Sequence, residues 1–180
     1  MVKVYISLGS NIHPEKNILK AVRLLAEHVK VVDVSTVYRT EPLGGLPQPD
    51  FYNCVVKVET DVDPRRLKFG ILRSVEERLG RKREKDKYAP RTIDIDILAY
   101  GDLDVSTEDV TIPDRDVMTR PFLATPLSEL SPDTILPHAN KPIREIADQF
   151  KNHRMIPLRE YSETVKQLVR TMGESAQQTD

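Results

Sequence analysis

The sequence predicts an α+β fold in which one antiparallel sheet has two helices on one face. Three observations support this prediction. Runs rich in β-branched and aromatic residues recur within the first hundred positions, as they do in strands. Two stretches between these runs repeat apolar residues at helical spacing. A long loop over residues 40–50, with three prolines and two glycines, separates the second strand from the third. The predicted order is therefore β-α-β-β-α-β.

The first strand is predicted over Val2 to Leu8, and Gly9-Ser10-Asn11 then turns the chain. Pro14 suits the first turn of a helix, which we expect to cover residues 14–29. A second strand follows over Val31 to Tyr38. One face of the helix is apolar, because aliphatic residues return at spacings of four, three and four: Ile18, Val22, Leu25 and Val29.

The third strand is predicted over Phe51 to Glu59. Asp63-Pro64 then supplies an N-cap and a first-turn proline, and the helix that follows ends at Gly80. Its apolar residues are spaced four apart: Leu67, Ile71, Val75 and Leu79. Residues 81–90 form a charged loop, and Thr92 to Ala99 form the fourth strand.

This order is that of the split βαβ sandwich called ferredoxin-like. The two helices then cover one face of the sheet, and the other face is left open for a ligand. Beyond residue 100 we expect a hairpin over residues 104–112 and short helices over residues 119–130 and 142–150. We expect one domain over residues 1–156, then a C-terminal extension over residues 157–180 that contains a last helix and a polar tail.

The composition is that of a soluble globular protein, with 39% hydrophobic and 31% charged residues among 180. The net charge of −1 argues against a bulk electrostatic grip on nucleic acid or on an acidic membrane. A single cysteine, Cys54, excludes a disulfide framework within the chain and fits a reducing cytosol. The start of the chain is too short and polar for a signal peptide, so we expect a cytoplasmic protein.

Two aspartates stand two positions apart in the fourth strand. Strand side chains alternate between faces, so Asp94 and Asp96 point the same way, while Ile93, Ile95 and Ile97 point into the core. A solvated outer face is one interpretation. Aspartate is depleted in strands, however, and two neighbouring carboxylates repel unless a cation is present. Carboxylates and phosphate oxygens are the usual Mg²⁺ ligands, and two such ions clamp phosphoryl transfers.

The loop before this strand is strongly basic. Residues 81–91 hold six basic and two acidic residues and lead directly into the aspartate pair. A solvated charged loop is one interpretation. The other is a phosphate site, because arginine guanidinium groups bind phosphate through two parallel hydrogen bonds. Cations beside a pair of metal-binding carboxylates indicate a polyphosphate held by both.

The long loop ends in an aromatic and a carboxamide. Phe51 and Asn53 share one face of the third strand, and Tyr52 takes the other. A ring and a carboxamide on one face can stack on a flat heterocycle and hydrogen-bond its edge. A phenylalanine in a strand is more often part of the core, so the pattern alone is weak.

Several motifs together resemble the 6-hydroxymethyl-7,8-dihydropterin pyrophosphokinase family of folate biosynthesis, over about residues 1–150. The most specific is the block over residues 89–98, APRTIDIDIL, with DFYN upstream at residues 50–53. The others, in the family's order and spacing, are SLGSN (residues 7–11), TEPLG (40–44), QPDFYN (48–53), GRKR (80–83), and Ile112-Pro113 followed by Met118, Arg120 and Phe122.

The resemblance implies that ATP donates its β,γ-pyrophosphoryl group to the pterin hydroxymethyl oxygen and leaves as AMP. It implies two Mg²⁺ ions bound by Asp94 and Asp96, and catalytic roles for Arg81 and Arg91 beside them. It implies a pterin site with two stacking rings, formed by Thr40, Pro42, Leu43, Gly44, Phe51, Asn53 and Phe122. It implies a nucleotide site formed by Glu76, Arg81, Arg83, Tyr88, Arg91, Ile97, Thr111, Asp114, Arg115 and Arg120.

Two positions depart from the family pattern, which often has a histidine after the proline. Here Asp114 follows Pro113, and Arg115 replaces a more usual aromatic or polar residue. An anion near phosphate is unfavourable unless it pairs with a cation, and Arg115 or Arg120 is close in sequence. Nucleotide affinity is the property that these departures affect.

The expected chemistry needs alignment and charge neutralisation more than a strong base. No His, Cys or Lys is placed as an obvious base, and a metal can acidify the hydroxyl. The 40–50 and 80–90 loops are the candidates for closing over the substrates and excluding water. The partners are then ATP and the dihydropterin, with no nucleic acid and no membrane, and the protein is a monomer or a homodimer.

Two other functions are considered. Ferredoxin-like sheets also bind RNA by stacking bases on aromatic residues. That function predicts a basic open face, whereas this chain has a net charge of −1 and places two carboxylates on that face. A different two-metal nucleotidyl transferase would need the aspartates but has no use for Phe51, Asn53 and Phe122 around a heterocycle.

Overall fold

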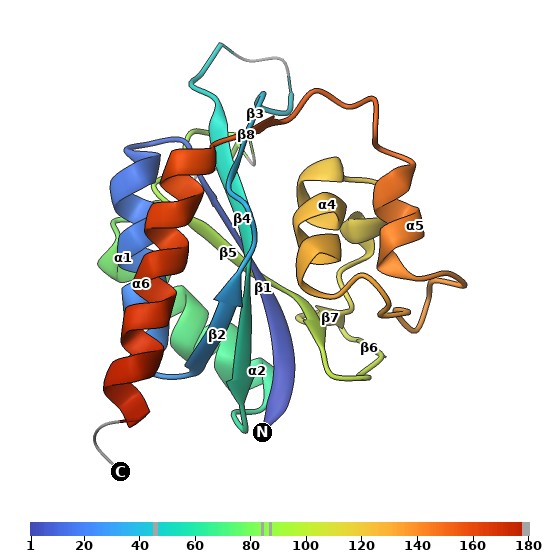
Figure 1. Ribbon diagram of the computed structural model, residues 1–180, viewed down its shortest axis with the longest axis horizontal. Coiled ribbons are helices and arrows are strands. Elements are labelled where there is room, and N and C mark those ends of the chain that lie inside the picture. Colours follow the sequence, from blue (N-terminus) through green and yellow to red (C-terminus); the bar gives the residue numbers. More distant parts are fainter. Residues whose placement is uncertain (45–46, 84, 87, 178–180) are drawn as a thin grey trace.

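The centre of the fold is an antiparallel sheet with the strand order β5-β1-β4-β3-β8, in which β2 also pairs with β4 (Figure 1). The computed structural model describes residues 1–44, 47–83, 85–86 and 88–177. Parts of the two predicted loops (residues 45–46, 84 and 87) and the end of the predicted tail (178–180) lie outside the described residues. The strands of the sheet are β1 (Val2–Ser10), β2 (Lys30–Val34), β3 (Tyr38–Thr40), β4 (Phe51–Thr60), β5 (Asp94–Tyr100) and β8 (Ile156–Pro157).

Helices connect these strands in the predicted order. Asp63 caps the second helical run by accepting a hydrogen bond from the Arg66 backbone N–H at 3.0 Å, and Gly80 follows the run with a positive φ of 75°. The ferredoxin-like prediction is confirmed. The helices on this side of the sheet are α1 (Pro14–Ala26), α2 (Pro64–Arg66), the π-helix η1 (Leu67–Leu72), α3 (Arg73–Arg78) and the C-terminal α6 (Arg159–Gln177).

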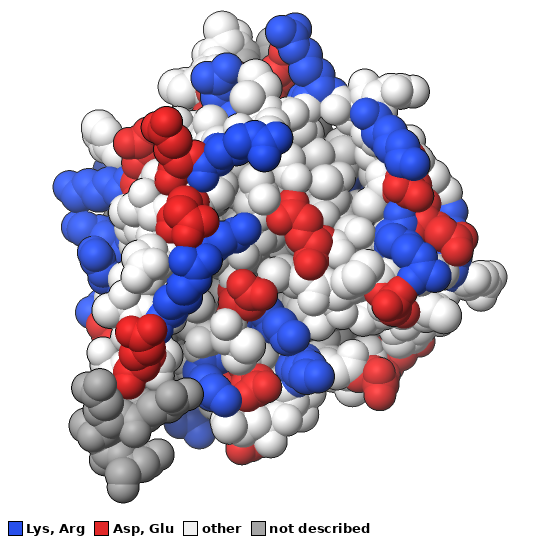
Figure 2. All heavy atoms as spheres, viewed as in Figure 1, with Lys and Arg blue, Asp and Glu red and all other residues white. Residues whose placement is uncertain are grey.

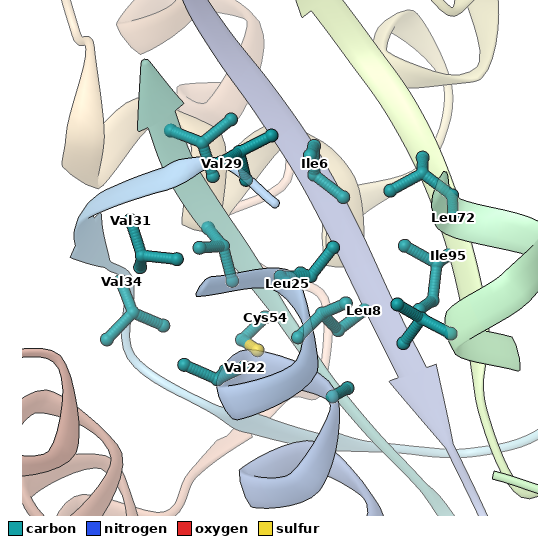
Figure 3. Close-up of a cluster of buried hydrophobic side chains, with 14 of the residues drawn as sticks. Ile6, Leu8, Val22, Leu25, Val29, Val31, Val34, Cys54, Leu72 and Ile95 are labelled. Atoms are coloured by element: carbon teal, nitrogen blue, oxygen red, sulfur yellow. The ribbon is translucent and has the colours of Figure 1, made fainter. Parts of the chain in front are cut away.

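The main core lies between this helical layer and the sheet. Alternate residues of β1 point into it, so that Leu8 pairs in register with Cys54 of β4 and Ile95 of β5. Figure 3 shows Cys54 among aliphatic side chains that include Val22 and Leu25 of α1. Cys54 is only 1% exposed, which confirms that it points inward, and burial raises the pKa of its thiol to about 12.

The prediction of a single second strand over residues 31–38 was wrong. Two strands, β2 and β3, stand in its place, and residues 35–37 separate them. The break arises because side-chain hydroxyls take the place of backbone acceptors there. Val55 N–H donates to Ser35 Oγ at 2.9 Å, and Val37 N–H donates to Ser162 Oγ at 2.8 Å. The first helix is also shorter than predicted, since α1 ends at Ala26.

The opposite face of the sheet is open only in part. The chain beyond β5 forms a hairpin and three helical segments, two of which pack on this face as a second layer (Figure 1). A second core forms there, in which Val55 and Leu98 of the sheet meet Leu127 and Ile143 of the helices. These elements are β6 (Val105–Ser106), β7 (Thr111–Ile112), the 3₁₀ helix η2 (Arg115–Met118), α4 (Pro121–Leu130) and α5 (Ile143–Asp148). The expectation of a fully open face is thus corrected, because this layer leaves only one end uncovered.

The C-terminal extension completes the helical side. Strand β8 pairs with β3 at the edge of the sheet, and α6 lies beside α1 and β2 (Figure 1). Val165 of α6 is fully buried and Val169 is 6% exposed, so this helix belongs to the main core.

The surface shows no large area of one charge on the face in view, where basic and acidic side chains are interspersed (Figure 2). Within the described ranges, none of the helices combines the length and the apolar character that a membrane span requires.

Candidate active site

A pocket opens at the uncovered end of the sheet, on the side that carries α4. Strands β1, β4 and β5 form its floor, and the loops before β4 and β5 form its walls. Most of the predicted site residues meet in it. Its lining consists of Ser7, Leu8, Gly9, Thr40, Glu41, Leu43, Phe51, Asn53, Tyr88, Arg91, Asp94, Asp96, Asp114, Asp116, Arg120, Phe122 and Leu123.

The aspartate pair projects into this pocket as the strand pattern predicts. Ile93 and Ile95 are 0% and 4% exposed on the helix side, and Asp94 and Asp96 line the pocket on the other. Burial, followed by the negative charges of Asp94, Asp114 and Glu76, raises the pKa of Asp96 to about 6. The pocket therefore holds concentrated negative charge that a cation would relieve.

Two arginines flank the outer aspartate. Arg91 donates from a terminal guanidinium nitrogen to Asp94 Oδ2 at 2.9 Å, and a terminal nitrogen of Arg81 lies 3.7 Å from Asp94 Oδ1. Both side chains are largely buried, at 14% and 11% exposed. Arg81 Nε has no hydrogen-bond partner among the described residues. A buried donor without a partner is costly, so this nitrogen is suited to an anionic ligand.

The residues predicted to bind a heterocycle also line the pocket. Phe51 and Asn53 line the pocket from β4, and Phe122 reaches it from the first turn of α4. Asn53 Nδ2 donates to Thr40 Oγ1 at 2.7 Å, which fixes the orientation of the carboxamide. Gly9 is needed opposite it, because a Cβ at this position would lie only 2.8 Å from Asn53 Oδ1.

A hydrogen-bond network that was not predicted from the sequence joins the 40–50 loop to the basic loop. Asn11 Nδ2 donates to Gln48 Oε1 at 2.8 Å, and Asn11 Oδ1 accepts from Arg91 N–H at 2.8 Å. Gln48 Nε2 donates to Tyr88 O, also at 2.8 Å. The Tyr88 ring packs against Gly44, whose φ is 88°. Asn11 and Gln48 stand inside conspicuous motifs, but only the fold brings their side chains together.

Glu76 lies behind the aspartates rather than in the pocket. It is 3% exposed, and Oε1 accepts from Ile95 N–H at 2.9 Å, between the two aspartates. Oε2 pairs with Arg83 of the basic loop at 2.8 Å. Burial raises the pKa of Glu76, and the charge of Asp94 adds to the effect. Glu76 thus ties β5 to the basic loop.

Asp114, which departs from the family pattern, lies in the pocket lining. Asp114 caps η2 by accepting from Asp116 N–H at 2.9 Å, and burial raises its pKa. Arg120 was one of the two arginines expected to neutralise Asp114, but its Nε pairs with Asp116 Oδ2 at 2.9 Å. Arg115 is exposed and does not line the pocket.

Several predicted residues stand outside the pocket lining. Ile97 is 5% exposed and packs in the main core, on the helix side of β5. Thr111 is exposed in β7. The remaining predicted residues that do not line the pocket are Pro42, Gly44, Glu76, Arg81, Arg83 and Arg115. Conversely, Ser7, Glu41 and Asp116 line it without having been predicted, although Ser7 and Glu41 lie in the quoted SLGSN and TEPLG motifs.

Comparison with known proteins shows the family to which the sequence is similar. The family model described as 7,8-dihydro-6-hydroxymethylpterin-pyrophosphokinase (HPPK) matches residues 5–132. A 2-amino-4-hydroxy-6-hydroxymethyldihydropteridine pyrophosphokinase of Haemophilus influenzae is 37% identical over 161 residues, which are 88% of this chain and 99% of that protein. A protein of the same name from Aquifex aeolicus is 39% identical, over 81% of this chain and 90% of its own.

A similar fold is found among solved structures. The Plasmodium falciparum HPPK-DHPS structure with pterin and p-hydroxybenzoate superposes with a TM-score of 0.68 at 16% identity. The match covers 84% of this chain and 42% of that one, so this chain spans less than half of that structure's length. At this identity the likeness shows the fold alone.

Proposed function

Because the chain belongs to the 7,8-dihydro-6-hydroxymethylpterin-pyrophosphokinase family and is therefore a pyrophosphokinase of folate biosynthesis, we propose its reaction and the roles of its residues. The β,γ-pyrophosphoryl group of ATP moves to the hydroxymethyl oxygen of 6-hydroxymethyl-7,8-dihydropterin, and AMP leaves. The observation that supports this most is a single pocket that joins two aromatic rings and a carboxamide to an aspartate pair flanked by arginines.

The pterin occupies the wall formed by β4 and α4. Its flat ring stacks between Phe51 and Phe122, and the carboxamide of Asn53 hydrogen-bonds its edge. Thr40 holds that carboxamide in one orientation through its hydroxyl group, 2.7 Å from Asn53 Nδ2. A fixed donor and acceptor pair discriminates between heterocycles, because a wrong edge leaves buried polar groups unpaired.

Asp94 and Asp96 would hold two Mg²⁺ ions together with the phosphates of ATP. The described residues contain no cluster of three or more His, Cys, Asp or Glu side chains suited to a metal. Two carboxylates whose remaining ligands come from phosphate and water are the environment that Mg²⁺ prefers. Burial first, and then the neighbouring carboxylates, raise the pKa of Asp96, and a bound cation would oppose both effects. When bound, Mg²⁺ neutralises phosphate charge and makes the pterin hydroxyl more acidic.

Arg81 and Arg91 exchange partners during the reaction. In the structure described here their guanidinium groups neutralise Asp94. With a cation held by Asp94, the guanidinium groups of both arginines would bind the phosphates instead. Their charge then opposes the negative charge that builds on the bridging oxygen as AMP departs. No strong protein base is required, because positioning and charge neutralisation account for most of the catalysis of phosphoryl transfer.

The loops exclude water from the reacting groups. Asn11 and Gln48 connect the loop beside the pterin to the loop beside the phosphates, so that the two close as one unit. Closure prevents hydrolysis of ATP and strengthens the electrostatic interactions inside the site.

The direct test is release of AMP by the purified protein with ATP and Mg²⁺. We expect AMP to form only when 6-hydroxymethyl-7,8-dihydropterin is added, with one pterin diphosphate formed per AMP. Release of pyrophosphate instead of AMP would identify a nucleotidyl transferase and overturn the proposal. Asp96→Asn, which keeps the side-chain shape, serves as the inactive control.

A further inference from the structure

We propose that Ser162, in the C-terminal extension, is a positioning residue for the pterin half of the active site. The inference rests on the function proposed above. The matched family model ends at residue 132, so the extension formed by β8 and α6 lies outside it. In Figure 1 this extension meets the sheet at β3, the strand that ends beside the pocket.

The extension provides both hydrogen-bond partners of one buried backbone unit. Val37 is 0% exposed, and its N–H donates to Ser162 Oγ at 2.8 Å. Its carbonyl accepts from Leu158 N–H at 2.9 Å. Ser162 is itself 4% exposed and donates its hydroxyl hydrogen to Leu158 O at 2.7 Å. A single hydroxyl therefore links the first turn of α6 to the residue directly before β3.

Strand β3 transmits this restraint to the pocket. It has only three residues, which pair Tyr38 with Asn53 and Thr40 with Phe51 of β4. Thr40 holds the Asn53 carboxamide at 2.7 Å. Such a short strand has few bonds of its own, so its position depends on what anchors its ends. On its other side β3 pairs only with β8, at Tyr38 and Arg39, among the described residues.

A second contact reaches the same region of β4. The ring of Tyr161, next to Ser162, lies 5.8 Å from the ring of Tyr52, centroid to centroid. Tyr52 stands between Phe51 and Asn53, on the helix side of the strand. The extension therefore supports both strands that carry the pterin residues, from behind the sheet.

The effect is selective because the phosphate half lies at the opposite edge. The sheet order is β5-β1-β4-β3-β8, so the aspartates of β5 are separated from β8 by three strands. We expect loosening of β3 to displace Thr40 and the Asn53 carboxamide that it orients, and to leave Asp94 of β5 in place. Ser162 is therefore expected to govern pterin affinity and not ATP affinity.

The test uses two matched variants of the full chain, Ser162→Ala and Thr164→Ala. Both remove a hydroxyl that donates to the carbonyl four residues earlier, but of the two only Ser162 also accepts a hydrogen bond within the described part of the chain, from Val37 directly before β3. Calorimetry measures binding of a non-hydrolysable ATP analogue with Mg²⁺, then of oxidised 6-hydroxymethylpterin to that complex. We expect Ser162→Ala to weaken pterin binding roughly tenfold and leave the ATP analogue unaffected, since one buried hydrogen bond is lost. Thr164→Ala should match the wild type in both.

Hydrogen exchange of residues 35–40 supplies an independent measurement. Faster exchange of this segment in Ser162→Ala, together with the selective loss of pterin affinity, supports the proposal. Equal weakening for both ligands, or a lower melting temperature with unchanged affinities, shows a purely structural role and overturns it. If the wild type binds ATP but no pterin, the proposed function fails instead, so the two failures are distinguishable.

Discussion

The buried carboxylate of Asp96 is expected to destabilise the folded protein. Its carboxylate stands on a partly covered sheet face beside Asp94, and burial together with that neighbour raises its pKa from 3.8 to about 6. At neutral pH the group is ionised against its environment. The ionised carboxylate of Asp96 is thus a local source of instability, and this gives a prediction about stability as well as activity.

Asp96→Asn should abolish turnover and yet stabilise the metal-free protein at pH 7, by about 1–3 kcal/mol. Between pH 4 and 6 the folded wild type binds more protons at Asp96 than the unfolded chain does, so this group makes stability fall as pH rises. Asparagine has no such dependence. The advantage of the variant should therefore be absent below pH 4, grow up to about pH 6 and then stay constant. Urea unfolding in the presence of a chelator, at pH 4 and pH 7, measures it, and a variant less stable than the wild type at pH 7 would contradict the prediction.

Phe122 gives a second test at the residue scale. Phe122→Ala removes one of the two rings proposed to stack on the pterin, and stacking on one ring is worth about 1–3 kcal/mol. Pterin binding should weaken roughly 5- to 150-fold, while binding of an ATP analogue changes little. Calorimetry with each ligand measures the two affinities. Equal losses for both ligands would contradict the assignment of the Phe122 ring to the pterin. Phe150→Ala, in the chain after α5, is a control aromatic that does not line the pocket.

At the scale of elements, the basic loop and β5 form one electrostatic unit. Arg91 and Arg81 both contact Asp94, and Arg83 pairs with Glu76, which in turn accepts from the backbone of β5. The loop is therefore attached to the strand that carries the aspartates, although it is rich in charge. We therefore expect the loop to act on the reaction and not only on the local potential.

Arg91→Ala and Arg81→Ala should each lower kcat by at least about 10²-fold, equivalent to about 2.7 kcal/mol of barrier. The Kd of an ATP analogue should rise less than about tenfold, because the guanidinium groups act mainly as charge builds in the transition state. Single-turnover rates at low and high salt provide the measurement. A salt-sensitive loss of affinity with unchanged chemistry would instead indicate a solvated loop. Arg78→Ala, whose guanidinium pairs with Glu27 outside the pocket, is the matched control.

The two loops beside the pocket are expected to act together. Gln48 accepts from Asn11 and donates to the backbone of Tyr88, so its side chain helps to join the 40–50 loop to the basic loop. Binding of the ATP analogue should strengthen pterin binding in the wild type, and Gln48→Ala should reduce that coupling without abolishing either site. Pterin calorimetry with and without the analogue measures it. Because coupling is reciprocal, the same reduction must appear when the order of addition is reversed.

At the scale of the whole molecule, two cores lie on the two faces of one sheet. The helical side includes α6, and the opposite side is the layer of α4 and α5. The pocket exists because the second layer stops short of the ends of β1, β4 and β5. The fold thus provides both the rigid floor of the pocket and its opening. The C-terminal helix α6 supports the floor, because it packs in the core beneath the sheet.

Val165→Ala should destabilise the protein by about 2–3 kcal/mol, because Val165 is fully buried in the main core and the lost methyl groups leave a cavity. Gln167→Ala, on the exposed side of the same helix, should have little effect. Urea unfolding compares the two. If Val165→Ala left stability unchanged, α6 would not be part of the core.

Local patterns in the sequence determined the elements and the faces of their side chains. The alternation over residues 93–97 was sufficient to place the isoleucines in the core and the aspartates in a pocket, because strand geometry repeats every two residues. Asp63 and Gly80 marked the ends of the second helical run for equally local reasons. The residues proposed to bind pterin and phosphate were predicted from a family resemblance added to these patterns.

Only the tertiary structure decided where distant segments meet. The split of the predicted strand over residues 31–38 depends on Ser162, which is 125 positions from Val37. The Asn11–Gln48 bond and the cover provided by α4 and α5 likewise join segments far apart in sequence. Such contacts leave no periodic trace, because their stability comes from burial and from pairing of backbone groups that only the folded chain brings together. The raised pKa of Asp96 has the same origin, since burial in the folded chain is its largest cause, ahead of the neighbouring charges.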